Sequence, residues 1–258
     1  MNRLRVEKLT RRFDGLLAID DVSFEVPPEG VTAVIGPNGA GKTTLFNMIS
    51  GFLNPTEGRI FFEDEELTGV APERIARRGL VRTFQLVQLF HNLTVLENVK
   101  VGRHVRTRAG LLAALARPRW ARQEEKETER RARELIEFVG LREQAEVRAS
   151  VLSYGRQRLL EIARALAAEP RLLLLDEAMS GLTPAETADA VTLVRRIHAE
   201  LRVAICVVEH VMEVVMPLSR RVVVLEYGQK IADGPPEEIA RNEQVITAYL
   251  GERRRGRA

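Results

Sequence analysis

The sequence predicts an α/β fold with a mainly parallel sheet and an inserted helical subdomain. Three observations lead to this prediction. Residues 31–35 form an apolar, β-branched run that enters a glycine-rich loop and then a helical pattern. From about residue 149 onward, strand-like runs alternate with helical patterns, which is typical of a parallel sheet. Between these parts, residues 95–140 are long, charged and helical in pattern.

The elements are expected in a simple order along the chain. The prolines at positions 27 and 28 end the strand at 22–26, and the pair Arg117-Pro118 is the one clear break in the helical region. The expected strands begin at Leu4 and then cover 22–26, 31–35, 58–62, 81–85, 171–175, 203–208 and 221–225, the last followed by a turn at 227–228. The expected helices lie after residue 43, after residue 71, over much of 95–140, and at 155–168 and 184–200.

The composition is that of one large globular domain. The chain has 258 residues, of which 45% are hydrophobic and 29% charged, and its net charge is +3. We expect a single domain, with 1–94 and 149–258 forming the α/β core and about 95–148 the helical subdomain. Cys206 is the one cysteine, which excludes an internal disulfide and suits a reducing cytoplasm. Charges from Arg3 onward are unlike a secretory signal, and no apolar stretch approaches the roughly 20 residues of a membrane span.

The most informative motif is the run at 36–43, which matches the phosphate-binding pattern G-x-x-x-x-G-K-[ST]. Its glycines let backbone N–H groups turn toward phosphate oxygens, Lys42 adds a cation, and the Thr43 hydroxyl can bind Mg²⁺. A glycine-rich turn without function is the alternative, but the strand before it and the helix after it argue against that. The chain is therefore predicted to bind a nucleoside triphosphate at the carboxyl edge of the sheet. The expected phosphate-binding residues are Gly36, Pro37, Asn38, Gly39, Ala40, Gly41, Lys42, Thr43 and Thr44.

Two acidic residues follow four leucines at 172–175. A buried strand can deliver Asp176 to the Mg²⁺ shell beside Thr43, and Glu177 can then face a water over the γ-phosphate. Alone, such a run is an ordinary strand end. Downstream of a phosphate-binding loop, it indicates a hydrolytic centre.

A second anion site is predicted at the start of the helix at 155–168. Ser153 is a typical N-cap, and Gly155 permits a close approach. A hydroxyl followed by exposed N–H groups at a helix N-terminus can bind an anion. Because the loop at 36–43 already supplies a complete phosphate site, this second site is expected to serve the nucleotide of another molecule.

Five motifs in their order and spacing resemble the ATPase subunit of ATP-binding cassette (ABC) transporters. They are the segments 36–43, 152–157 and 172–177 together with Gln85 and His210, so the resemblance covers nearly the whole chain. It implies a P-loop NTPase core with an N-terminal antiparallel β subdomain and an inserted α-helical subdomain. It also implies ATP and Mg²⁺ as the nucleotide and its metal.

Three further features are similar to the ATPases of branched-chain amino acid importers. These are 82–85 followed by 93–98, the long insert after Gly102, and the ending at 246–252. Urea and amide importer ATPases are closely similar. Lipopolysaccharide-export ATPases share the C-terminal feature but match less well around Gln85.

The resemblance implies a role for each matching residue. Lys42, Glu177, His210 and Gln85 would be catalytic: Lys42 holds the β- and γ-oxygens, Glu177 polarises water, His210 contacts the γ-phosphate, and Gln85 links Mg²⁺ or the water to the membrane-facing segment. Phe13 would stack on adenine, although it could instead be a core aromatic. The implied Mg²⁺ ligands are Thr43, Gln85 and Asp176, and the residues implied to bind the opposite subunit's ATP are Ser153, Gly155 and Gln157.

Three positions depart from the family pattern. Tyr154 replaces a glycine of the signature segment, and Ala178 replaces the proline that usually follows the catalytic glutamate. Thr183 stands where many relatives have aspartate. The first two changes remove no functional group, whereas the third alters the loop through which the resemblance implies communication between subunits.

The function implied is that of a motor subunit on the cytoplasmic face of the cell membrane, attached peripherally. Its partners would be transmembrane permease subunits, a second ATPase subunit that is identical or related, and indirectly an extracytoplasmic solute-binding protein, with no nucleic acid. A soluble cassette protein of DNA repair or ribosomes is a less favoured alternative. Such proteins usually have a long coiled coil or a second cassette, whereas in this sequence the insert is too short for such a coiled coil and the cassette is single. A regulator without turnover would lack Glu177 or His210.

Leu89 and Phe90, in the apolar stretch 86–93, are expected to form part of a groove for the membrane subunit, unless the stretch folds into the core.

Overall fold

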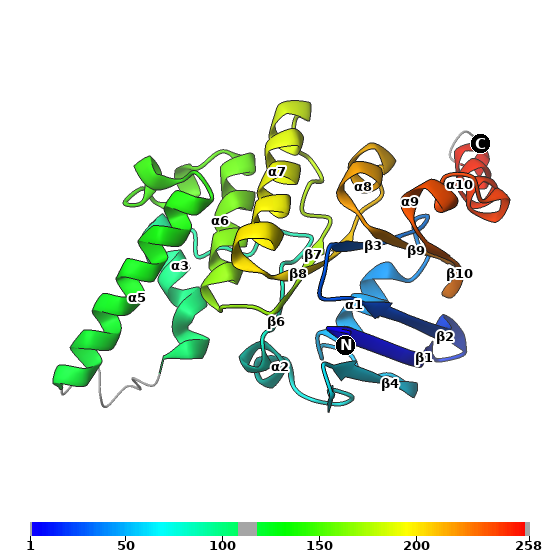
Figure 1. Cartoon of the computed structure of the whole chain (residues 1–258), viewed down its shortest axis with the longest axis horizontal. Helices are drawn as coiled ribbons and strands as arrows, with labels where there is room; N and C mark the ends of the chain where they lie inside the picture. Colours follow the sequence, from blue (N-terminus) through cyan, green and yellow to red (C-terminus); the bar gives the residue numbers. More distant parts are fainter. Residues whose placement is uncertain (1, 108–117, 256–258) are drawn as a thin grey trace.

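The computed structural model describes residues 2–107 and 118–255. Its central sheet has six strands in the order β10-β9-β3-β8-β7-β6 (Figure 1). Every neighbouring pair is parallel except β9 and β10. The strands are β3 Val31–Ile35, β6 Leu80–Arg82, β7 Leu172–Asp176, β8 Ala204–Val208, β9 Arg221–Glu226 and β10 Gln229–Gly234. All residues of β3, β7 and β8 are buried, as expected of parallel strands covered on both faces.

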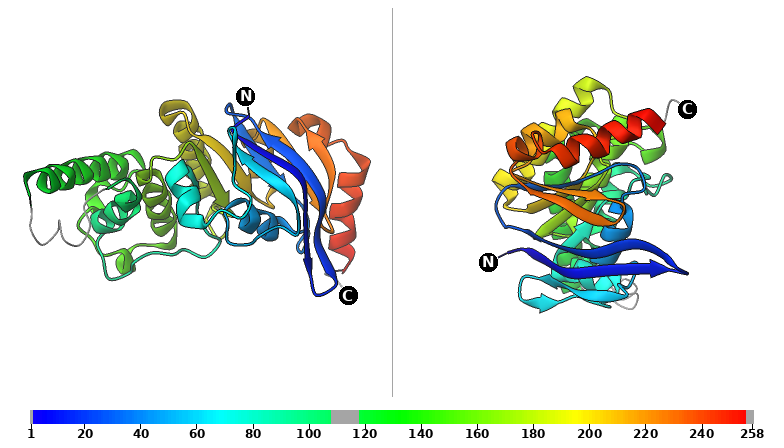
Figure 2. Two further views of the ribbon diagram at one scale, coloured as in Figure 1. Left: turned by 90° about the horizontal axis from the view of Figure 1, so that it is seen from below. Right: turned by 90° about the vertical axis from the view of Figure 1, so that its right-hand side faces the viewer.

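An antiparallel sheet lies beside the central sheet as a separate layer (Figure 2). Its strands, in the order β2-β1-β4-β5, are β2 Leu16–Val26, β1 Leu4–Phe13, β4 Glu57–Phe62 and β5 Glu65–Glu66. Helix α1, Lys42–Ile49, lies between the two sheets, and its Phe46 shares one buried cluster with Phe24 and Phe62 of this sheet and Val34 of β3. The α/β fold with its antiparallel N-terminal sheet is therefore confirmed.

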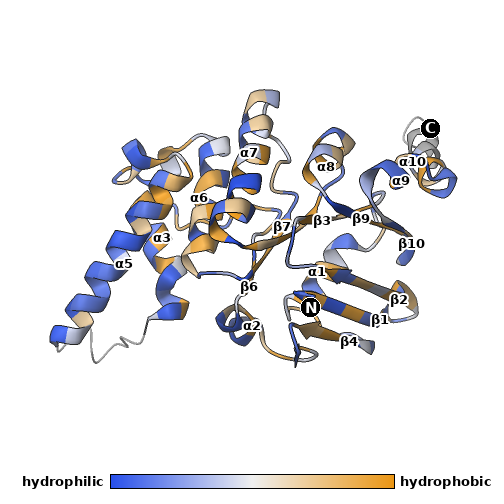
Figure 3. Ribbon diagram, viewed as in Figure 1, coloured by the Kyte–Doolittle hydropathy of each residue, from blue (hydrophilic) through white to orange (hydrophobic). Residues whose placement is uncertain are grey.

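Helices gather at the opposite end of the molecule (Figure 1). Helix α5, Arg119–Phe138, packs against α3, Val95–Arg103, and α6, Tyr154–Ala167. Most of α5 is hydrophilic, while α6 beside it carries hydrophobic residues (Figure 3). The other helices are α2 Pro72–Arg78, α7 Pro184–Leu201, α8 Met212–Leu218, α9 Pro236–Ile239 and α10 Glu243–Arg255, with short 3₁₀ turns η1 His104–Arg106, η2 Arg142–Gln144 and η3 Ala149–Val151.

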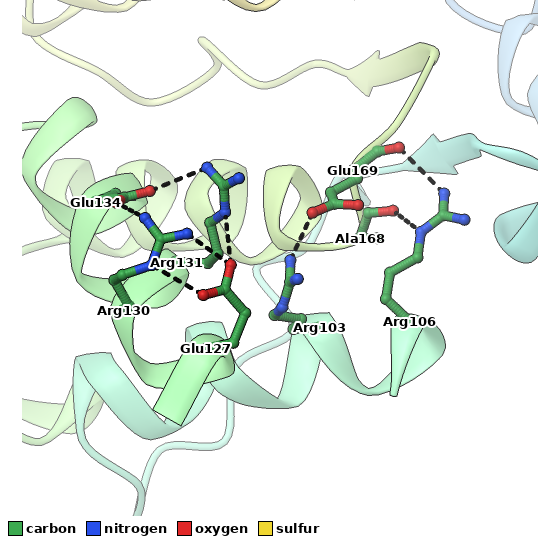
Figure 4. A network of polar contacts seen from close by, with 8 residues as sticks. All are labelled: Arg103, Arg106, Glu127, Arg130, Arg131, Glu134, Ala168 and Glu169. Atoms are coloured by element: carbon green, nitrogen blue, oxygen red, sulfur yellow. Dashed lines mark hydrogen bonds and ion pairs between the residues drawn. The ribbon is translucent and has the colours of Figure 1, made fainter. Parts of the chain in front are cut away.

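Two arginines tie this helical end to the rest of the molecule (Figure 4). Arg103 forms an ion pair with Glu169 at 2.7 Å, just beyond the end of α6. Arg106 donates to the carbonyl oxygens of Ala168, Glu169 and Arg77 at 2.7 to 3.1 Å. Carbonyls at helix ends lack intrahelical partners, so Arg106 satisfies those that follow α6 and one in the last turn of α2.

Two differences from the sequence expectation affect the site. Strand β6 ends at Arg82, whereas a strand over 81–85 was expected. Strand β10 and helices α8 to α10 were not anticipated. Pro118 is the N-cap of α5, as the expected break requires, whereas residue 117 lies outside the described residues.

Two further properties follow from this packing. Cys206 is fully buried in β8, and burial raises the pKa of its thiol. Across the ranges 2–107 and 118–255, the structure contains no helix with the length and apolar character needed to cross a bilayer.

Candidate functional site

The predicted site residues follow the carboxyl ends of four adjacent strands. The glycine-rich loop follows β3, His210 lies two residues beyond β8, Asp176 ends β7, and Gln85 lies three residues beyond β6. Because these strands are parallel neighbours, their ends meet at one edge of the sheet, where ligands of open α/β sheets bind. The structure thus brings together residues from four distant parts of the sequence.

The glycine-rich loop needs its glycines for space and conformation. Gly36, Gly39 and Gly41 have φ values of 155°, 77° and 98°, a region that residues with a Cβ rarely adopt. A Cβ on Gly36 would also lie 2.1 Å from the carbonyl oxygen of Leu225, and one on Gly41 would lie 2.7 Å from that of Ala18. Glycine therefore suits the backbone conformation at all three positions and also the limited space at Gly36 and Gly41.

Lys42 and the start of α1 give this loop its positive charge. Lys42 is buried, and its Nζ donates to the carbonyl oxygens of Gly36 and Pro37 at 2.6 and 2.8 Å. Gly41 provides no side-chain cap to α1, whose first turn contains no acidic residue. Thr43 is exposed at this helix end and Thr44 is half-buried. An uncapped N-terminus with a lysine beside it fits a phosphate group.

Asp176 offers one carboxylate oxygen in a suitable position for a cation. Its Oδ2 accepts from Arg82 Nη2 at 2.6 Å, and both side chains are buried. Its Oδ1 is buried and has no hydrogen-bond partner in the structure, which is unusual for a buried polar atom. Among the described residues, no group of three or more His, Cys, Asp or Glu side chains could hold a metal ion. This arrangement fits Mg²⁺, which binds through one or two carboxylates together with substrate phosphates.

Glu177 and Gln85 are in direct contact. Gln85 Nε2 donates to Glu177 Oε2 at 2.8 Å, and the Glu177 N–H donates to the carbonyl oxygen of Val208 at 2.9 Å. Glu177 has a φ of 46°, a strained conformation for a residue with a side chain, and such strain concentrates at functional sites. The glutamine therefore holds one oxygen of a half-buried carboxylate.

His210 lies beside the glycine-rich loop. Its side chain is exposed and lines a cavity of about 470 Å³ together with Gly36 and Asn38. The remaining lining residues come from α8 to α10 and the segments next to them: Met212, Glu213, Ile239, Ala240, Val245, Ile246 and Tyr249. Among the described residues that line this cavity, none belongs to 152–157.

A buried acid next to His210 was not anticipated from the sequence. Glu209 Oε1 accepts from the N–H of Met179 at 3.0 Å, while its Oε2 has no hydrogen-bond partner among the described residues. Burial, and to a lesser extent the nearby Glu177 carboxylate, raises the pKa of Glu209 to about 7. Glu209 thus joins the end of β8 to the turn that follows Glu177.

The second predicted anion site lies at the start of α6. Ser153 is the N-cap residue, is exposed, and makes no capping bond with its side chain. Gly155 lies close to Glu186, and a Cβ on Gly155 would lie 2.3 Å from Glu186 Oε1 unless that side chain moved. Gln157 Nε2 donates to the carbonyl oxygens of Leu152 and Ala149 at 3.2 and 3.4 Å, so its amide faces the preceding turn.

The three departures from the family pattern have simple surroundings. Tyr154 packs against Gly181, where an added Cβ would lie 3.1 Å from the tyrosine ring. Thr183 caps α7 and forms a capping box with Glu186, a role that both threonine and aspartate can fill. Ala178 is buried.

Phe13 lies at the end of β1, as its sequence position indicated. It is exposed, and the Arg11 guanidinium lies 4.5 Å from the centre of its ring. Its expected stacking on adenine stays a prediction.

The apolar stretch at 86–93 is divided between surface and core. Phe90 is 51% exposed and Leu86 is 80% exposed. Leu89 packs in the main core, so the expectation that it contributes to a surface groove is wrong. Asn98 is buried and fixes the loop, because its side chain accepts from the N–H of Phe90 and donates to the Phe90 carbonyl at 2.9 and 3.0 Å.

Comparison with known proteins agrees with this geometry. The model of the ABC transporter family matches residues 19–180, and the model of the branched-chain amino acid ATP-binding cassette transporter matches 229–254. The high-affinity branched-chain amino acid transport ATP-binding protein BraF of Pseudomonas aeruginosa is 45% identical over 249 residues, which cover 96% of this chain and 98% of that protein. The corresponding protein LivG of Escherichia coli K12 is 44% identical over the same shares of both chains.

The fold also matches a solved structure. The ADP conformation of MJ1267, described as an ATP-binding cassette of an ABC transporter, has a TM-score of 0.85 and 34% identity, covering 98% of this chain and 100% of that one. The chain therefore belongs to the ATP-binding cassette ATPases of ABC transporters, within the branch of the branched-chain amino acid transport ATP-binding proteins.

Proposed function

We propose that this chain hydrolyses ATP as the motor subunit of an importer of branched-chain amino acids. The observation that carries the hydrolytic part is the 2.8 Å bond between Gln85 and Glu177, next to the buried Asp176. The names of the relatives BraF and LivG, which describe branched-chain amino acid transport, support the class of solute.

Each side chain has a task in this proposal. Lys42, which donates to two loop carbonyls in the present structure, turns to the β- and γ-phosphate oxygens. Thr43 and Asp176 would hold Mg²⁺, which when bound would neutralise charge on the phosphates. Glu177 orients and polarises the attacking water, and His210 contacts the γ-phosphate. Catalysis is then mainly positioning and charge stabilisation.

Two of these subunits enclose the nucleotides between them. The residues expected to complete the site, Ser153 and Gly155, lie at the start of α6 and do not line the cavity beside the glycine-rich loop. A second ATPase subunit therefore supplies them to the nucleotide of the first. Closure of the pair drives permease subunits in the membrane, to which the chain attaches peripherally at the cytoplasmic face. Phe90, exposed on a loop that Asn98 holds, belongs to the surface that meets the permease.

Reconstitution with permease subunits and a binding protein encoded nearby tests the function. We expect leucine to stimulate ATP hydrolysis in proteoliposomes and to be taken up, while the Glu177→Gln variant does neither. Stimulation by urea without any by leucine would assign the solute to the alternative class. Absence of ATP hydrolysis with all subunits present would refute the proposed function.

A further inference from the structure

A buried ion pair on α6 lies outside the set of residues that touch the nucleotide. Arg158 Nη1 and Glu161 Oε2 are 3.1 Å apart, and each side chain is only 3% exposed. Removing two charges from water costs free energy that their attraction alone often fails to offset. Further hydrogen bonds from the pair offset part of this cost, although Arg158 Nε is buried without a hydrogen-bond partner in the structure.

Those further bonds all reach one peptide segment more than 70 residues away. Arg158 donates through Nη1 to the carbonyl oxygen of Phe84 at 3.1 Å and through Nη2 to that of Gln85 at 2.6 Å. Glu161 Oε1 accepts from the N–H of Phe84 at 3.2 Å. Strand β6 has already ended at Arg82, so the backbone of Phe84 and Gln85 is held by α6 and no longer by the ladder of the sheet.

The two ends of this connection are the two halves of the site. Toward the start of α6, Arg158 lies about 7.5 Å along the helix axis from Ser153, and its guanidinium is 5.2 Å from the centre of the Tyr154 ring. In the other direction, the side chain of Gln85 donates to Glu177 at 2.8 Å. An unbroken series of contacts therefore leads from the start of α6 to the Glu177 carboxylate, just beyond the end of β7.

We propose that Arg158 and Glu161 are positioning residues that make Gln85 follow the N-terminus of α6. When ATP bound to one subunit contacts Ser153 of the second subunit, α6 of the second subunit shifts. That shift sets the position of Gln85, and with it Glu177, in the second subunit. The two hydrolytic sites of the dimer are thereby linked. This inference rests on the proposed ATP-driven dimer of the preceding subsection.

A double-mutant cycle on kcat tests this link. Arg158→Met/Glu161→Leu removes both members of the pair together, so that no unpaired charge stays buried. In the parent chain, Ser153→Ala should lower kcat about tenfold, as loss of a hydrogen bond to a charged group does. In the pair-free chain, the same substitution should lower kcat by less than about twofold, because the two changes interrupt one connection. Binding of ATP to the isolated chain should be unchanged.

A control variant separates this role from general support of α6. Arg103→Met removes the ion pair with Glu169 at the other end of that helix. Among the described residues, Arg103 forms no hydrogen bond with Gln85. The cost of Ser153→Ala should stay about tenfold in that background. Equal costs of Ser153→Ala with and without the Arg158–Glu161 pair would overturn the inference while leaving the proposed function intact.

Hydrogen exchange gives a second test that does not depend on turnover. In a Glu177→Gln background, ATP should slow amide exchange over residues 83–92 at the concentrations where it drives dimerisation. The pair-free variant should still dimerise but lose this protection. Retained protection would overturn the inference. Failure of the parent chain to assemble with ATP, alone or with a related ATPase, would instead refute the proposed function, and the inference with it.

Discussion

The buried carboxyl of Glu209 makes the stability of this protein depend on pH in a way that one substitution can remove. The folded state raises its pKa from the ordinary value of 4.5 to about 7, chiefly by burial and further through Glu177 across the ends of β8 and β7, while Arg158 on α6 opposes the shift. The folded chain therefore retains this proton at pH values where the unfolded chain has released it. Stability from this group is full below pH 4.5 and is lost as the pH rises toward about 7.

The magnitude follows from the two pKa values. A raised pKa of this size corresponds to about 2.5 kcal/mol of unfolding free energy lost between about pH 5 and about pH 8. Glu209→Gln keeps an oxygen to accept from Met179 and carries no charge at either pH. Relative to the parent, the variant should therefore gain about 2.5 kcal/mol on going from the lower to the higher pH, or roughly 5 to 10 °C in Tm.

Urea unfolding followed by circular dichroism at the two pH values measures this difference directly. Comparing variant with parent at each pH cancels the other titrating groups, which both proteins share. Glu143→Gln, an exposed glutamate on η2, serves as the matched control and should show no change with pH relative to the parent. A Glu209→Gln advantage that is the same at both pH values would refute the reasoning, because a group that is ionised in both states cannot produce the pH dependence.

Three further outcomes are expected from the proposed site. Glu177→Gln should reduce ATP hydrolysis by about 10²- to 10⁴-fold while Mg-ATP binding persists, which rapid-quench and equilibrium binding assays would distinguish; near-normal turnover would contradict its role. Lys42→Ala should weaken ATP binding itself, measured by calorimetry, because it removes the cation nearest the phosphates. Phe90→Asp should leave ATP hydrolysis by the isolated chain unchanged but abolish co-purification with permease subunits and solute uptake; normal uptake would move the docking surface elsewhere.

Much of the site could be predicted because its chemistry is local in the sequence. Gly36, Lys42 and Thr43 fall within eight residues between a strand and a helix, and Asp176 and Glu177 end a run of four leucines. Parallel strands then bring their carboxyl ends to one edge whatever the details of packing. The sequence therefore sufficed for the fold class and for the segments that meet at this edge.

What could not be predicted depends on partners far along the chain. Arg82 reads as one more strand residue, yet it pairs with Asp176, 94 positions later. Arg158 and Glu161 lie in a helix that also contains Arg156, Gln157 and Arg164. Nothing local therefore sets the pair apart or indicates that its partners are Phe84 and Gln85. For the same reason the sequence predicts a strand that continues to Gln85. In the structure β6 ends at Arg82, and the backbone of Phe84 and Gln85 instead forms hydrogen bonds with side chains of α6.

Leu89 illustrates a different limit. Its stretch is mainly apolar and too short for a clear period, so periodicity does not tell which side chains face inward. Its burial depends on Asn98, which fixes the loop through contacts with Phe90 and thereby turns one neighbour inward and leaves the other outside. A buried asparagine eight residues after Phe90 carries no signal of that role in a single sequence.

Cys206 can serve as a built-in chemical probe of local opening of the central sheet. A thiol enclosed in β8, with a pKa raised by burial, presents almost no thiolate to an alkylating reagent in the folded state. Modification then requires the strands on either side of β8 to separate, so its rate reports the free energy of that opening. The chain contains no other cysteine. A second cysteine introduced at an exposed site such as position 90 or 153 would therefore react selectively with a labelling reagent. The native thiol would meanwhile record whether nucleotide binding tightens the centre of the molecule.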